Sequence, residues 1–156
     1  MKIIEQLETY APLILRVGLA SVFLYFGVSQ LIRPEAFVGW LPAEAGLVPL
    51  TPRTLIVLNG AFETLFGTFL VLGLFTRISA FLLGGHLLMI TFSIGLTEIG
   101  VRDFGLSIAT LALACFKVAP LSLDAFFEKQ LAGERMRTTS ESQEEYPEEY
   151  PEQHQS

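Results

Sequence analysis

A carboxylate, Glu63, lies in an apolar stretch long enough to cross a lipid bilayer, at residues 59–79. A charge at the bilayer centre costs roughly 2.5 to 3.5 kcal/mol or more, so an ionisable residue there normally faces partners inside the protein. Two further apolar stretches contain Arg16 and His86. A carboxylate and an imidazole can hydrogen-bond the oxygens of a bound molecule and transfer protons. We therefore take these residues, with Asn59 one turn before Glu63, as candidates for ligand binding or a proton relay.

The sequence leaves open how Glu63 is accommodated. Arg16 is its first expected partner and His86 its second, because a buried carboxylate is stabilised by a nearby cation. Alternatively Glu63 is protonated, and a neutral carboxyl group hydrogen-bonded to His86 needs no charged partner. In a third alternative the polar side chains only fix the register of packed helices.

Other kinds of chemistry find little support in the residues. Cys115 is the single cysteine, so the chain has no intrachain disulfide, Cys-x-x-Cys pair or thiolate cluster. The two histidines, His86 and His154, are too few for a metal or haem site built from protein ligands alone. We find no phosphate-binding loop, nucleophile elbow or zinc motif, and no basic cluster suited to nucleic acid. We expect no metal, no intrinsic cofactor and no autonomous enzyme.

The composition is typical of a membrane protein. The 156 residues are 51% hydrophobic, and their mean hydropathy is +0.52. A segment of about 20 apolar residues crosses a hydrocarbon core of about 30 Å. Backbone polar groups in lipid must be satisfied within the segment, which favours helices. We predict an all-α fold, an integral membrane four-helix bundle, with spans at residues 12–32, 54–75, 77–97 and 103–119.

Each predicted span has one stripe of small or polar residues at helical spacing. Small residues let helices approach closely in lipid, and hydroxyls and amides hydrogen-bond across the contact. We therefore expect the stripes to face one another and the large apolar residues to face lipid. The stripes are Arg16, Ala20, Phe23, Gly27 and Gln30; Asn59, Gly60, Glu63 and Gly67; Ser79, His86, Ser93 and Thr97; and Asp103, Ser107, Thr110, Ala114 and Lys117.

The loops predict how the spans are connected. Only residues 75–77 join the second span to the third, so these spans form a tight antiparallel hairpin with Glu63 and His86 as neighbours near the midplane. The loop at residues 33–53 contains four prolines, which exclude a long helix. Its Trp40 suits a membrane interface. We interpret this loop as a lid on the outer surface.

The chain divides into a membrane domain at residues 1–127 and an acidic tail at residues 128–156. Residues 133–156 contain seven Glu against two Arg and few apolar residues, a composition typical of disorder. Lys and Arg favour the cytoplasmic side of a membrane protein. The side that holds both termini has six of them against three on the other side, which places both termini in the cytoplasm.

Four stretches of the sequence resemble the DoxX family of membrane proteins, which has DoxX- and DoxD-like members. LRVGLASVFLYFGVSQL at residues 15–31 is similar to the first span of that family, and ETLFGTFLVLGLFTR at residues 63–77 to the second. VRDFGL at residues 101–106 and LSLD at residues 121–124 resemble the entry and exit of the fourth span. The resemblance covers about residues 12–127 and leaves out the tail.

The resemblance implies a four-span protein of a bacterial or archaeal cell membrane. It also implies an association with redox systems, since DoxX-type proteins include a subunit of thiosulfate:quinone oxidoreductase and partners in membrane thiol and oxidative-stress complexes. Arg102 and Asp103 are expected to form a polar pair at the outer interface. The positions that match polar positions of the family are Arg16, Glu63, Arg77, Arg102 and Asp103.

Three functions remain open at this point. In the first, the chain is a non-catalytic or accessory subunit of a membrane redox system, and it binds a lipophilic ligand such as a quinone while a partner protein supplies the electrons. In the second, several copies form a small-molecule transporter, although no inverted repeat or broken helix supports this. In the third, the chain is a structural assembly protein. The candidate partners are membrane lipids, a redox partner protein and further copies of the chain.

Overall fold

The structure, a computed structural model, describes residues 2–116 and 122–145, and this part of the chain is entirely helical. The all-α prediction is therefore confirmed for these residues. In chain order the elements are α1 (Lys2–Ile32), the 3₁₀-helices η1 (Pro34–Trp40) and η2 (Ala43–Leu47), α2 (Pro52–Leu72), α3 (Thr76–Ile94), α4 (Glu98–Cys115) and α5 (Leu123–Glu145).

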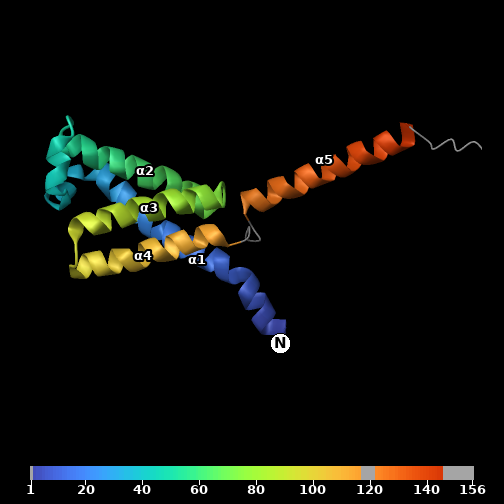
Figure 1. Ribbon diagram of the computed structural model, residues 1–156, viewed down its shortest axis with the longest axis horizontal. Helices are drawn as coiled ribbons and strands as arrows, with labels where there is room; N and C mark the ends of the chain where they lie inside the picture. The colour runs from blue at the N-terminus through green and yellow to red at the C-terminus, as the bar shows by residue number, and fades with distance from the viewer. Residues whose placement is uncertain (1, 117–121, 146–156) are drawn as a thin grey trace, which may run out of the picture.

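Helices α1 to α4 lie side by side in a bundle, and α5 projects away from one end of it (Figure 1). The turn between α2 and α3 lies at the end from which α5 projects. The opposite end holds η1, η2 and the connection between α3 and α4. We call these the turn end and the lid end of the bundle.

Glycine sets the close contact between α1 and α2. A Cβ atom on Gly27 would lie 2.8 Å from the backbone nitrogen of Thr64 and 2.9 Å from the carbonyl oxygen of Gly60. A side chain has no room at such distances, so this crossing requires glycine. Helices α3 and α4 approach in a similar way, because a Cβ atom on Gly84 would meet Leu111 at 2.8 Å. The bundle thus consists of two closely packed pairs, α1 with α2 and α3 with α4.

Among the described residues, three of the four predicted stripes face the bundle interior; Lys117, the last residue of the α4 stripe, lies outside the described residues. On α1 the buried residues include Ala20 and Phe23, and on α4 Ser107 and Thr110 have no exposed surface. Gly60, Glu63 and Gly67 are buried on α2. Small and hydroxyl side chains therefore form the helix contacts, as the sequence predicts for these helices.

The stripe predicted for α3 is only partly correct. Ser79 is buried and His86 is partly buried, but Ser93 and Thr97 are exposed. The close approach at Gly84 turns a different face of α3 toward α4, so that Leu83 is also buried. His86 lies at the edge of that face, on the side of α2.

Capping residues shift the predicted helix boundaries. Thr51 accepts a hydrogen bond from the backbone N–H of Thr54 at 3.2 Å, so α2 begins at Pro52. Thr97 accepts one from the N–H of Gly100 at 3.0 Å, so α4 begins at Glu98 rather than at Asp103. Hydropathy alone predicts a late start, because the first turns of α4 are polar.

Three helices are long and apolar enough to cross a membrane, at Tyr10–Ile32, Pro52–Leu72 and Thr76–Ile94. Helix α4 is outside this group because its first turns contain Glu98, Arg102 and Asp103, which lower its hydropathy. Length and composition therefore support three of the four predicted spans.

Helix α5 runs through a large part of the tail for which the sequence predicts disorder. The sequence predicts disorder from residue 128, whereas α5 continues to Glu145. Glu, Gln, Lys, Arg, Leu and Met are good helix formers, and α5 contains no proline, so local propensity favours a helix even without an apolar face. Residues 146–156 of the predicted tail lie outside the described residues.

Candidate functional site

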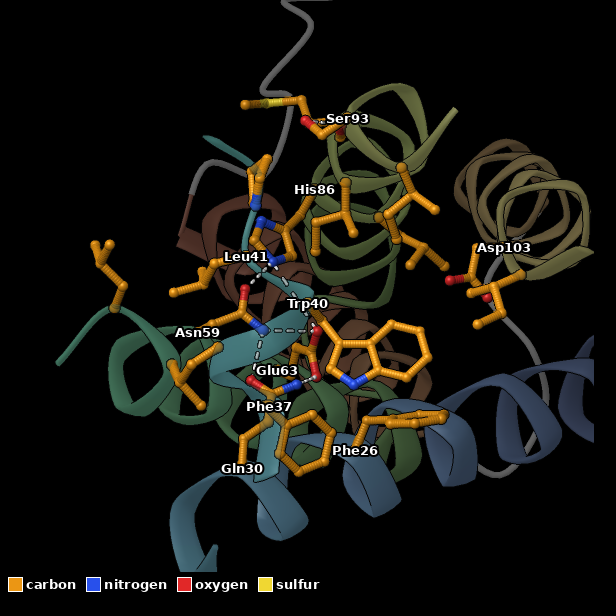
Figure 2. A pocket seen from close by; sticks show the side chains of 18 of the residues that line it. Phe26, Gln30, Phe37, Trp40, Leu41, Asn59, Glu63, His86, Ser93 and Asp103 are labelled. Carbon is orange, nitrogen blue, oxygen red and sulfur yellow. Dashed lines mark hydrogen bonds and ion pairs between the residues drawn. The ribbon is translucent and has the colours of Figure 1, made fainter. Parts of the chain in front are cut away.

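Four polar side chains form a connected set of hydrogen bonds inside the bundle (Figure 2). Nε2 of His86 lies 2.6 Å from Oδ1 of Asn59. Nδ2 of Asn59 donates to Oε1 of Glu63 at 3.1 Å and to Oε1 of Gln30 at 2.7 Å. Nε2 of Gln30 donates to Oε2 of Glu63 at 3.3 Å. We call Gln30, Asn59, Glu63 and His86 the Glu63 cluster.

Glu63 is stabilised by neutral amide groups. Its side chain is buried, and each of its two carboxyl oxygens accepts a hydrogen bond from an amide. Nε2 of His86 lies 4.0 Å from Oε1, close enough for a direct interaction after a small movement. Because Oδ1 of Asn59 can only accept, the contact with Asn59 places a proton on Nε2 of His86. The side-chain amide of Asn59 therefore links the carboxyl group of Glu63 to the imidazole ring of His86.

The glycine crossing of α1 and α2 positions this cluster. Asn59 and Glu63 are one turn apart on α2 and lie on the same face of that helix. Gln30 is in the last turn of α1. A Cβ atom placed on Gly60 would lie 2.9 Å from the Cβ atom of Gln30. A larger residue at position 60 would push Gln30 away from Glu63. His86 approaches from the middle of α3, as the short α2–α3 turn predicts.

The Glu63 cluster lines a cavity of about 740 Å³ at the lid end. Small-molecule sites in proteins are typically about 300 to 1,000 Å³ and mostly apolar. Helices α1 to α4 form the walls, and the segment with η1 and η2 partly covers the cavity with Phe37, Trp40 and Ala45. Figure 2 shows the ring of Trp40 beside the Glu63 carboxyl group and near the ring of Phe26. The cavity is thus a mostly apolar, aromatic space with the Glu63 cluster on one wall.

Arg102 and Asp103 form a second polar group on the α4 wall of the same cavity. Nη2 of Arg102 lies 2.8 Å from Oδ1 of Asp103. Asp103 is buried, whereas the side chain of Arg102 is 53% exposed and its guanidinium lies 5.9 Å from the centre of the Phe26 ring. The sequence predicts this pair, and the structure adds that it faces the cavity.

The structure does not bring Arg16 to Glu63. Arg16 is 2% exposed and packs against Gly73 at the turn end. Gly73 is ten positions after Glu63, which is about 15 Å at 1.5 Å per residue. The charge that acts on Arg16 is that of Asp124 in α5. Among the described residues, the polar contacts of Glu63 are within its own cluster, so the first partner predicted for it is wrong.

Two parts of the site are not predicted as such from the sequence. Gln30 appears in the α1 stripe but not among the candidate ligand residues, although its amide lies on the same face as Arg16 and Phe23. Trp40 is predicted to lie at the membrane interface, and its role in closing the cavity follows only from the fold of η1. A polar amide within an apolar stripe is the signal that identifies Gln30.

Comparison with protein families matches residues 11–96 to DoxX, which is more than half of the chain. The chain belongs to the DoxX family. This confirms the resemblance predicted from the sequence, and together with the three helices of sufficient length it identifies a membrane protein. The part of this DoxX protein that matches runs from α1 to the end of α3, so it contains Arg16 and the whole Glu63 cluster, while Arg102 and Asp103 lie beyond it. No match is found among curated proteins or among solved structures.

Proposed function

We propose that this DoxX protein is a non-catalytic, accessory subunit of a membrane redox system and binds a lipophilic molecule with a polar, oxygen-bearing head, such as a quinone. The observation that carries this proposal is the Glu63 cluster on the wall of an apolar cavity of about 740 Å³. Hydrogen-bonded polar groups at one position in an otherwise apolar space select a ligand that combines an apolar body with a polar head.

The chemistry of the Glu63 cluster suits a head that exists in carbonyl and hydroxyl forms. With Nε2 of His86 donating to Asn59, Nδ1 accepts a hydrogen bond when the ring is neutral and donates one when the ring is protonated. Glu63 accepts in its charged form and donates in its neutral form, so the two groups can exchange protons with a ligand oxygen. The cluster therefore accommodates either form of the head without a change in the helices.

The remainder of the cavity suits a flat head and an apolar tail. Phe26, Phe37 and Trp40 present aromatic rings on which a planar ring can stack. Arg102 and Asp103 offer polar contacts on the α4 wall. In this proposal the electrons come from a partner protein, since a single cysteine cannot form a dithiol pair within the chain.

We also propose that α4 is a fourth span and that the turn end and both termini face the cytoplasm of a bacterial or archaeal cell. Helix α4 packs along α3, and its 18 residues are about 27 Å long at 1.5 Å per residue. Its charged residues lie at the lid end, where Arg102 and Asp103 pair.

Thiol labelling tests this orientation. In a Cys115→Ser background, Glu44→Cys should react with an impermeant thiol reagent in intact cells, and Glu128→Cys only after permeabilisation. The reverse pattern would refute the orientation.

Thermal unfolding of the purified protein with a short-chain benzoquinone tests the proposed function. A ligand that binds only the folded state at about 100 times its Kd stabilises it by about 2.7 kcal/mol, so the unfolding midpoint should rise and then saturate. Glu63→Gln should lose most of this rise. Glu98→Gln makes the same chemical change at an exposed carboxylate outside the cavity and should behave like the wild type.

The same experiment separates the proposal from its alternatives. An alkyl alcohol of equal chain length should give little stabilisation, because it lacks the second oxygen and the ring. No shift with the quinone at saturating concentration, or an equal shift in Glu63→Gln, would reject the cluster as the ligand site. The structural role, in which the cluster only sets helix packing, would then be the better account.

A further inference from the structure

Asp124, in the first turn of α5, joins α5 to the turn between α2 and α3. Oδ1 of Asp124 accepts a hydrogen bond from the backbone N–H of Phe75 at 2.8 Å, and Oδ2 accepts one from the N–H of Thr76 at 2.9 Å. These N–H groups belong to the start of α3, where the cap residue Phe75 offers no side-chain acceptor. The backbone N–H of Asp124 donates to the carbonyl oxygen of Gly73 at 3.0 Å. One residue thus binds the end of α2 and the beginning of α3.

The contacts around Gly73 bring α1 into the same junction. Gly73 ends α2 with a positive φ of 69°. A Cβ atom there would overlap the guanidinium of Arg16 and the Cβ atom of Ser122, so both residues pack directly on its backbone. Arg16 is buried at this point, and the opposite charge of Asp124 attracts it. The carboxylate therefore lies between a helix N-terminus and a buried cation, both of which favour it.

The junction also contacts α4. Nη2 of Arg77, in the first turn of α3, donates to the carbonyl oxygen of Phe116 at the end of α4 at 3.4 Å. All the bundle helices and α5 therefore meet at the turn end. At the lid end the cavity lies among the two helix pairs, with side chains of all four helices on its walls. The bundle is thus joined by Asp124 at the turn end and contains a cavity at the lid end.

We infer that Asp124 is a clamp through which α5 controls the width of the cavity. The two helix pairs form two rigid arms, the α2–α3 turn is their hinge, and Asp124 holds the hinge closed from outside. Ser93, which lines the cavity, is about 25 Å along α3 from Thr76, so a rotation of about 5° at the hinge moves it by about 2 Å. A partner that binds α5 and pulls Asp124 away from the turn therefore opens the cavity. This regulatory role rests on the proposed ligand function of the cavity.

The fluorescence of Trp40 tests the clamp without any ligand. Trp40 is the only tryptophan and lines the cavity, so tryptophan emission reports on this region alone. Asp124→Asn keeps the size of the side chain but removes its charge and one of its two acceptors. Because release of the clamp opens the cavity, we expect the constant for acrylamide quenching of Trp40 to rise by about two-fold. We also expect the backbone amides of the first turn of α5 to exchange faster.

Glu128→Gln is the matched control, because it neutralises an exposed carboxylate one turn further along α5, and it should leave both readouts unchanged. If Asp124→Asn speeds exchange in α5 but leaves Trp40 quenching unchanged, α5 is not coupled to the cavity and the inference is overturned. If exchange in α5 is also unchanged, Asp124 is no clamp. Quinone-dependent stabilisation is measured separately, so failure of the clamp and failure of the ligand site give different results.

A second variant covers the case in which Asp124→Asn does not fold. Ser122→Ala removes the hydrogen bond from the N–H of Ala125 to the hydroxyl of Ser122, 3.1 Å in length, and leaves the Asp124 carboxylate in place. It should loosen the first turn of α5 and change Trp40 quenching in the same direction as Asp124→Asn, by a smaller factor. Unchanged quenching with a loosened α5 would again overturn the inference.

Discussion

Two carboxylates, Asp124 at the turn end and Glu63 at the lid end, have contrasting surroundings. Asp124 accepts hydrogen bonds from backbone N–H groups of one short turn, which keep their positions as long as that turn is folded. Glu63 accepts hydrogen bonds from the side-chain amides of Gln30 and Asn59, which can rotate and find other partners. It also faces a cavity. The first arrangement joins α5 to the bundle, and the second can respond to a ligand.

A carboxylate in a membrane protein is therefore not by itself a ligand site. The type of donor and the presence of a cavity decide which role it has. Backbone donors and a nearby buried cation indicate a contact between helices, as at Asp124. Side-chain donors from several helices beside an apolar space indicate a binding role, as at Glu63.

Gly73→Ala should have the largest effect on stability, because it breaks the turn end. Alanine at a φ of 69° is strained, and its Cβ atom would overlap Arg16 and Ser122. We expect a loss of about 2 to 4 kcal/mol, measured as a lower unfolding midpoint in detergent. Gly18→Ala is the control, since a Cβ atom there meets nothing within 4 Å. A loss no larger than that of the control would show that the turn is not tightly packed.

Gly27→Ala should have an intermediate effect at the lid end. Its Cβ atom would lie 2.7 Å from the hydroxyl oxygen of Thr64 and 2.8 Å from the Thr64 nitrogen, so α1 and α2 must separate. We expect a loss of about 1 to 3 kcal/mol together with weaker ligand binding, because Gln30 moves away from Glu63. Gly85→Ala, in open space on α3, should be neutral. Normal ligand binding in Gly27→Ala would show that the ligand site does not depend on the α1–α2 crossing.

Glu63→Gln should have the smallest effect on stability. Glutamine has one acceptor oxygen for the two amide donors that Glu63 satisfies, so one amide must rotate or lose its partner. We expect a loss of about 1 kcal/mol, measured by the same unfolding midpoint. A loss as large as that of Gly73→Ala would mean that Glu63, like Asp124, mainly supports the fold.

The sequence predicts the parts of the site that depend on local rules. The short link at residues 75–77 predicts that α2 and α3 form a hairpin, and hence that Glu63 and His86 are neighbours. Helical spacing predicts the buried faces of α1, α2 and α4. These features follow from chain length and periodicity, which are independent of the details of tertiary packing.

The remaining features depend on contacts between distant segments. The sequence predicts Arg16 as the first partner of Glu63, but Arg16 packs on Gly73 near Asp124 at the turn end. The buried face of α3 is set by Gly84 against Leu111, which periodicity in α3 cannot indicate. The cavity itself is lined by residues of all four bundle helices and of η1 and η2. Packing of this kind is a property of the assembled helices.

Copurification from native membranes tests most directly whether the Glu63 cluster binds a lipophilic ligand. Wild type, Glu63→Gln and Glu98→Gln would be purified in parallel, and the extracted lipids and quinones analysed by mass spectrometry. The account predicts a quinone-like molecule enriched on wild type and Glu98→Gln and lost from Glu63→Gln. If all three proteins are folded and contain only bulk lipid, the cavity is not a ligand site and the account is contradicted.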